Sequence, residues 1–221
     1  WWALAGAAAA AAVVFLLGRG GTGPASSSGT ATGGSSRLRI VLAGTALGAS
    51  LGSVTGIITM VDSAAFDAHR FWVVGSLAGR DMATVEATAP FVLVGAVMTL
   101  ILCGPLNVLL LGEDSAAALG VRVGPVRVLA LAAITLLAGG STALAGPVAF
   151  VGLVVPHVLR LLLGPDLRRL MPLALVAGPC LVLASDIVGR VVAAPAEIAV
   201  GVVTAFLGAP TLLWLVVRGR S

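Results

Sequence analysis

Residues 90–124 read PFVLVGAVMTLILCGPLNVLLLGEDSAAALGVRVG, and this stretch decides the fold. From Pro90 to Leu111 no side chain is charged. The run is long enough for a helix that crosses a bilayer, which takes about 20 apolar residues. A short polar segment, Glu113 to Gly120, follows it, and the chain becomes apolar again near Pro125. The pattern predicts two membrane spans joined by a short helix outside the membrane.

The composition places the whole chain in a membrane. Hydrophobic residues make up 59% and charged residues 10% of it, and the mean hydropathy is +1.12. A soluble domain does not tolerate that balance. Because backbone polar groups in lipid must be satisfied internally, the prediction is an all-α, polytopic helical bundle in a single transmembrane domain over residues 1–221. The chain starts at Trp1 in apolar sequence, so an N-terminal part is expected to be missing.

Seven apolar segments occur along the chain, at residues 3–17, 38–61, 90–111, 125–144, 148–163, 170–188 and 200–217. Residues 20–36, rich in Gly, Ser and Thr, are predicted to form a flexible cytoplasmic loop. The apolar piece 71–77 is too short to cross, and we expect it to lie on the surface or to dip partway in. Cys103 and Cys180 fit no metal spacing, so neither a metal nor a cofactor is predicted.

The arginines orient the spans. The net charge of +4 comes from arginine alone, and we interpret it as a topology signal rather than as nucleic-acid binding. Alternating loops place three arginines on one side, namely Arg70, Arg80 and Arg190. The other side is predicted to be cytoplasmic because it holds Arg19, Arg37, Arg39, Arg122, Arg127, Arg160, Arg168, Arg169, Arg218 and Arg220. The short helix after Leu111 then lies in the cytoplasm.

That short helix has its own start and stop signals. Glu113 and Asp114 open it, where helix N-terminal amides favour negative charge. Gly120 stands where a left-handed C-terminal cap is expected. A capped helix favours a docking element for a soluble partner, although an interfacial turn that only connects two spans fits these residues as well.

Two further features stand out on the spans. Small residues recur every four positions at Gly44, Gly48, Gly52 and Gly56, which predicts close helix packing within the subunit or a helix that lines a pathway or dimer seam. Asp186 and Arg190 share one helix face at i, i+4. They form either a structural ion pair or an outward site for an acidic partner.

Three other residues are interpreted more simply. Glu197 is a candidate N-terminal cap for the last span. Pro156 is predicted to kink its helix, and His157 to be a cytoplasm-facing residue at a helix end.

Several blocks of the sequence resemble one known family. Residues 111–120 match Leu-Gly-x-x-x-Ala-x-x-Leu-Gly. LAGTALG at 42–48, FWVVGSL at 71–77, GLVVPHVLRL at 152–161 and LGAP at 207–210 follow in the expected order. These blocks are similar to the FecCD-type family of ABC importer permeases, which take up iron-siderophore, haem or cobalamin.

The resemblance implies a ten-helix permease fold, of which this chain looks like spans four to ten. It implies a multi-pass protein of the bacterial cytoplasmic membrane that works as a homodimer or with a paired homologous subunit, together with ABC ATPase subunits and an extracytoplasmic substrate-binding protein. Arg190 matches an arginine that docks the binding protein. Within residues 111–124, the positions that match the cytoplasmic coupling helix are Gly112, Glu113, Asp114, Ala116, Ala117, Leu119 and Gly120.

The function expected from this resemblance is the permease subunit of an importer that moves ferric siderophore. A cobalamin or haem permease of the same family is an alternative. The chain is not expected to be an enzyme, since it has no Walker A sequence and ATP hydrolysis must come from another chain. The rival class, an ATP-independent secondary transporter or channel, would need ionisable residues at mid-membrane, and the sequence places none deep within its spans.

Overall fold

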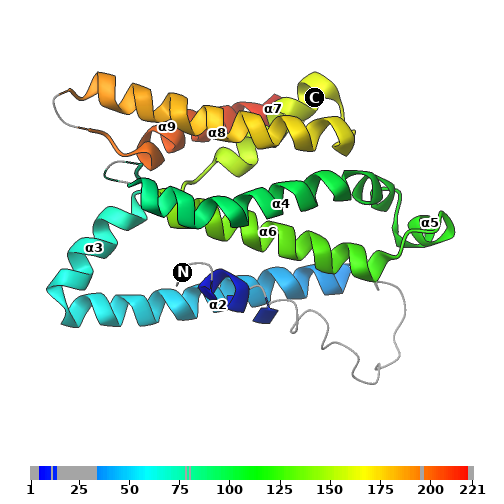
Figure 1. Ribbon diagram of the computed structural model, residues 1–221, viewed down its shortest axis with the longest axis horizontal. Helices are drawn as coiled ribbons and strands as arrows, with labels where there is room; N and C mark the ends of the chain where they lie inside the picture. The colour runs from blue at the N-terminus through cyan, green and yellow to red at the C-terminus, as the bar shows by residue number, and fades with distance from the viewer. Residues whose placement is uncertain are drawn as a thin grey trace. The chain divides into compact units, whose positions relative to one another are not determined.

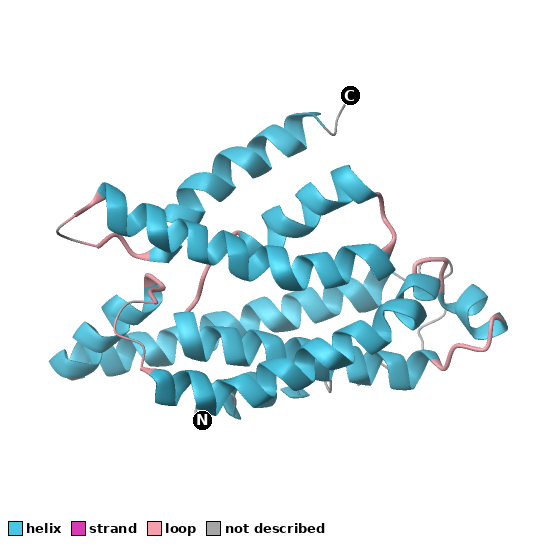
Figure 2. Cartoon of the chain, turned by 45° about the horizontal axis from the view of Figure 1, so that its top comes forward, coloured by secondary structure: helices cyan, strands magenta, loops and turns pink. Residues whose placement is uncertain are grey.

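The computed structural model describes residues 5–10, 12–13, 34–77, 79, 81–194 and 197–218, with the backbone alone at 34–40, 71, 212 and 214–218. The chain divides into two compact units, Trp1–Arg70 and Phe71–Ser221, and each is described by itself. Within the described ranges all regular structure is helical and no strand occurs (Figure 2). The all-α class predicted from composition is confirmed.

The first unit is dominated by one long helix, α2 (Gly34–Val61). The predicted loop 20–36 lies outside the described residues up to position 33, but its last three residues already belong to α2. Serines at 35 and 36 are well tolerated in a first helical turn, so the loop boundary was placed too late. Of the predicted first span, the described residues 5–10 and 12–13 are helical.

A helix that the sequence did not predict follows directly. Helix α3 (Ser63–Val73) begins after Asp62, whose carboxylate accepts hydrogen bonds from the backbone N–H groups of Ala64 and Ala65 at 2.9 and 3.3 Å. Asp62 thus satisfies donors that a helix start otherwise leaves free. The apolar piece 71–77 is therefore not one segment, because its first residues end α3 and the rest form a loop.

In the second unit, helices α4 (Met82–Leu109) and α6 (Val123–Ala145) pack along each other (Figure 1). Small residues let them approach closely: a Cβ added at Gly140 would lie 2.6 Å from Cγ2 of Val92. Ala133 is buried in the same contact region. Glycine and alanine at such a contact allow the short interhelical distances typical of membrane bundles.

Helices α7 (Val151–Leu163), α8 (Leu167–Val192) and α9 (Val200–Arg218) complete the unit, and α8 packs against α4, α7 and α9. Asp166 caps α8 by accepting a hydrogen bond from Arg168 N at 3.0 Å. Next to it, the amide of Asn107 near the end of α4 accepts a hydrogen bond from Leu167 N at 3.1 Å. The last turn of α4 and the first turn of α8 are therefore at the same end of the unit.

The opposite end of the unit is tied together by backbone contacts. Ser76 N donates to Ala145 O at 2.9 Å at the end of α6, and Gly201 N in α9 donates to Gly75 O at 3.2 Å. The loop after α3 thus joins the end of α6 to the start of α9. These bonds satisfy backbone groups that would otherwise be costly in an apolar surrounding.

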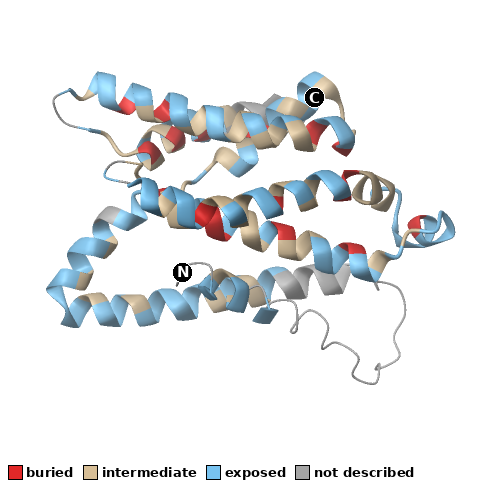
Figure 3. Cartoon of the chain, viewed as in Figure 1, coloured by how far each residue is buried: buried red, intermediate tan, exposed pale blue. Residues whose placement is uncertain are grey.

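In the part of the chain that the structure describes, four helical stretches are long and apolar enough to cross a membrane: Val41–Val61, Met82–Leu109, Val123–Ala145 and Leu167–Val192. Their outward side chains are largely apolar and exposed, for example Ile101 at 70% and Ile134 at 61%. Figure 3 shows how much of each of these helices is exposed. Such surfaces suit lipid rather than water. Helix α9 has 19 residues. Its apolar stretch with described side chains runs from Val200 to Thr211.

The predicted fifth span, residues 148–163, is shorter than expected. Helix α7 has only 13 residues, which rise about 20 Å against a hydrocarbon core of about 30 Å. The chain leaves α6 at Gly146, and Phe150 has a left-handed backbone with a φ of 68°. A helix cannot continue through such a residue, so α7 starts only at Val151.

Candidate coupling and docking sites

The short polar helix of the sequence is present as α5 (Glu113–Ala118), between α4 and α6. Gly112 precedes it with a φ of 103°, a conformation that residues with a Cβ rarely adopt. Glu113 and Asp114 occupy its first turn, as predicted.

The predicted cap at Gly120 is confirmed. Its φ is 82°, and its N–H donates to Ala117 O at 2.9 Å. Val121 N donates to Ala116 O, also at 2.9 Å. This pair of bonds is a Schellman motif, which stops the helix and directs the chain into α6.

Burial separates the residues of α5 into two groups. The side chain of Ala116 is fully buried, whereas those of the other coupling positions, Glu113, Asp114, Ala117 and Leu119, are exposed. Ala116 therefore anchors the helix on its own chain. Leu119 is 65% exposed and Leu111 67% exposed, so apolar surface flanks the helix.

An ion pair fixes the start of α5 to α6. One guanidinium nitrogen of Arg127, in the second turn of α6, bonds to the carboxylate of Glu113. Both side chains remain more than half exposed. From the sequence, Arg127 contributes only to the topology signal, and its contact with Glu113 is not predictable because the two residues are on different elements.

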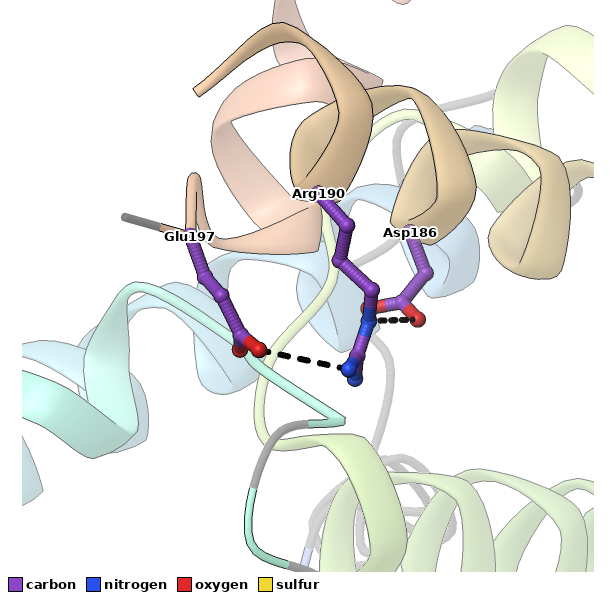
Figure 4. Close-up of polar contacts among 3 residues, drawn as sticks. All are labelled: Asp186, Arg190 and Glu197. Carbon is purple, nitrogen blue, oxygen red and sulfur yellow. Dashed lines mark hydrogen bonds and ion pairs between the residues drawn. The ribbon is translucent and has the colours of Figure 1, made fainter. Parts of the chain in front are cut away.

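Arg190 is held by two carboxylates (Figure 4). Its Nε donates to Asp186 at 2.8 Å along α8, and its Nη1 donates to Glu197 at 3.2 Å in the segment before α9. The i, i+4 pair expected from the sequence is confirmed. Arg190 and Glu197 are nearly half exposed, at 46% and 48%, whereas Asp186 is only 18% exposed.

The interpretation of Glu197 as a helix cap is wrong. Helix α9 begins at Val200, and the carbonyl of Ala199 accepts from the N–H groups of Val202 and Val203, so Glu197 lies too far upstream. Its carboxylate instead binds Arg190 and links residues 197–199, which precede α9, to α8. A charge pair across a loop is not visible from local sequence spacing.

The coupling and docking candidates lie at opposite ends of the second unit. Helix α5 follows the end of α4 that binds the start of α8 through Asn107. Arg190 lies in the last turn of α8, beside Ile198, whose N–H donates to Gly189 O. Figure 1 shows α5 beyond the shared end of α4 and α6, away from the last turn of α8. The arginine distribution predicts that the α5 end is cytoplasmic.

The glycine stripe lies on α2 in the first unit. A Cβ added at Gly44, Gly48, Gly52 or Gly56 meets nothing within 4 Å. Among the described residues of its own unit, the stripe therefore packs against no other helix. The assignment of these four glycines to a pathway or dimer seam stays a prediction.

His157 does not end a helix. It lies in the middle of α7, where its Nδ1 is 3.1 Å from Leu153 O. Pro156 is also inside α7. The expectation of a helix-end histidine was wrong because α7 continues to Leu163. No group of three or more His, Cys, Asp or Glu that suits a metal occurs in the part of the chain that the structure describes.

Comparison with known proteins places the chain in a family. The model of the FecCD transport family matches residues 1–218. The chain is 45% identical over 183 residues to the ferric enterobactin transport system permease protein FepD of Escherichia coli, with 83% of this chain and 54% of that protein covered. It is 36% identical over 184 residues to the hemin transport system permease protein HmuU of Yersinia pestis, with 83% and 55% covered.

A solved structure has the same fold. Its title is "An inward-facing conformation of a putative metal-chelate type ABC transporter", and it matches with a TM-score of 0.81 and 27% identity over 94% of this chain and 63% of that one. The chain spans about half the length of the curated relatives that it matches. Matched over nearly all of its own length, this multi-pass membrane chain belongs to the FecCD transport family.

Proposed function

We propose that this chain forms membrane-spanning helices of the permease in an ATP-binding cassette importer, and that α5 docks a separate ATPase subunit. The observation that carries the proposal is α5 itself. It is a capped helix with a single buried anchor, Ala116, and with exposed apolar side chains beside it. A connector would not need an oriented, partly apolar surface beyond the spans, whereas a soluble partner can bury one.

The solute is proposed to be a ferric siderophore. The 45% identical relative is named for ferric enterobactin, and the 36% identical one for hemin, which supports siderophore over haem. Cobalamin remains an alternative within the same family. A ferric siderophore and cobalamin are both large and polar. Each therefore needs a protein-lined path that opens alternately to the two sides of the membrane.

The proposed assembly has further partners. A second permease copy or a paired homologue completes the pathway, and the glycine stripe of α2 faces that pathway or the seam between the copies. An extracytoplasmic binding protein delivers the solute at the Arg190 end. ATP binding moves the ATPase subunits, α5 transmits the movement, and the populations of the outward-open and inward-open states shift.

Reconstitution of the intact permease with its ATPase and binding protein in vesicles tests the proposal. We expect ATP-dependent uptake of ferric enterobactin. Ala117→Arg places bulk and charge on the exposed face of α5 and should abolish uptake or release the ATPase, because packed interfaces have little spare volume. Ala83→Arg, the same change at the exposed opposite end of α4, is the matched control for retention of the ATPase. Normal ATP-driven uptake by Ala117→Arg would overturn the docking role of α5.

A further inference from the structure

We infer that the Glu113–Arg127 ion pair makes α5 and α6 move as one rigid body, so that a displacement of the coupling helix turns α6 directly. The inference rests on the proposed function, and it assigns a positioning role to Arg127, which lies outside the coupling helix. Beyond docking, α6 is the transmembrane helix through which the movement of α5 passes.

The two ends of α5 are attached to α6 in different ways. At its C-terminal end the Schellman bonds from Gly120 and Val121 close the helix and lead into α6 within a few residues. At its N-terminal end Glu113 binds Arg127 on α6 itself. A helix held at one end can swing, whereas a helix held at both ends keeps its direction relative to its partner.

The attachment of α5 to α4 is different in kind. Leu111 N donates to Val108 O and Gly112 N donates to Leu109 O, which are bonds of a turn that ends α4. The link then passes through Gly112, whose φ of 103° is available because it has no Cβ. No ion pair joins α5 to α4 among the described residues. What distinguishes the two connections is therefore the Glu113–Arg127 pair, which braces α5 against α6.

Helix α6 is suited to carry the movement further. Val126, next to Arg127, is buried, and Ala133 and Gly140 pack against α4 farther along. A rotation imposed at its first turns therefore reaches the opposite end of the unit, where Ala145 O holds the loop before α4.

The exposed pair is not expected to hold the fold together. Surface ion pairs contribute little to stability, because solvent screens them and their side chains lose freedom on pairing. Loss of the pair should therefore leave folding and insertion intact. This separates a positioning role from a structural one.

Spin labels at Ala118 in α5 and Ser141 in α6, both exposed, measure the relation between the two helices. The distance between the two labels is measured by pulsed electron–electron double resonance in the intact permease–ATPase complex, with and without ATP. We expect the same narrow distance distribution in both states. Glu113→Arg or Arg127→Glu should broaden the distribution and shift it on ATP binding. The exchanged double variant should restore a single narrow distance.

The controls separate the possible failures. Arg169→Glu makes the same charge reversal at an exposed arginine in the first turn of α8 and should leave the distribution unchanged. Retention of the ATPase is measured in every sample. Unchanged distances in both single variants, with the ATPase bound, would overturn the brace and leave the docking proposal standing. Broadening that the exchange does not repair would also overturn it, and would indicate that Glu113 contacts the ATPase directly. Failure of the unsubstituted permease to retain its ATPase would overturn both.

Discussion

Gly201, the second residue of α9, lies directly against the backbone carbonyl of Val74. A Cβ at position 201 would be 2.0 Å from that oxygen, well inside the contact distance of a carbon and an oxygen. The N–H of Gly201 also donates to Gly75 O at 3.2 Å. The loop after α3 is thus seated on the start of α9, and only glycine leaves room for it.

Gly201→Ala is therefore expected to separate the loop from α9 or to distort the start of that helix. Overpacked sites typically lose about 1–3 kcal/mol. The thermal midpoint of the purified protein should fall. Gly178→Ala is the matched control, because a Cβ there meets its nearest atom at 4.0 Å and alanine favours a helix by about 1 kcal/mol. An unchanged midpoint for Gly201→Ala would show that the contact is looser than described.

Arg190→Glu tests the proposed docking of the binding protein. The change replaces a cation by a third carboxylate beside Asp186 and Glu197. Affinity for the binding protein should fall by at least about tenfold, since like charges at a contact oppose association. Surface plasmon resonance with the binding protein measures it.

Glu197→Gln is the informative companion to that variant. It removes one of the two intrachain partners of Arg190 and leaves the cation in place. If Arg190 docks an acidic group, affinity should stay the same or increase. A loss of affinity equal to that of Arg190→Glu would mean that Arg190 acts only by holding the loop before α9.

Leucine at Gly48 and Gly52 tests the glycine stripe. Both positions are exposed within the first unit, and an added Cβ there meets nothing within 4 Å. Leucine is expected to fit this chain alone but to block the pathway or the seam with a second permease, so uptake should be abolished while membrane insertion is normal. The native residue at position 51, between the two glycines, is already a leucine, which shows that a bulky side chain is tolerated next to the stripe. Uptake at the unsubstituted rate would indicate that the stripe faces lipid.

Asp81 gives a pH-dependent contribution to stability. Its side chain accepts hydrogen bonds from the hydroxyl and the N–H of Thr84, and these bonds lower its carboxyl pKa. A lowered folded-state pKa means that the stabilisation is present above the usual carboxyl pKa of about 4 and is lost as the pH falls through the folded value.

The difference in thermal midpoint between the unsubstituted protein and Asp81→Ala should therefore be constant near neutral pH and shrink in acid. Asp81→Asn should keep most of the cap, since asparagine caps helices as well as aspartate, and it should not show this pH dependence. A midpoint difference that is independent of pH down to pH 3 would contradict the role of the ionised cap.

Local sequence signals predicted the parts of the fold that depend on local chemistry. The charge-free run from Pro90 to Leu111 falls mostly in α4, and the left-handed backbone of Gly120 follows from its place after an alanine-rich turn. The Asp186–Arg190 pair follows from helical spacing alone. Each of these is decided within a few residues.

Contacts between distant residues were not predictable in the same way. Asn107 and Leu167 are 60 positions apart, and Glu113 and Arg127 are 14 apart on different helices. The sequence also placed the ends of helices poorly, since α7 starts late because of the left-handed Phe150. A lone Asn or Phe in an apolar run carries no signal of its partner. Ala116 and Ala117 look alike in sequence, yet one is buried and the other exposed.

That difference provides the most direct test of α5 as the coupling helix. Single cysteines are introduced at Asp114, Ala116, Ala117 and Leu119, after Cys103 and Cys180 have been replaced, and each is combined with single cysteines on the ATPase surface. We predict crosslinks from the exposed positions 114, 117 and 119 in the assembled complex and none from the buried position 116. If none of the three exposed positions crosslinks in a complex that hydrolyses ATP, α5 is only a connector and the account is wrong.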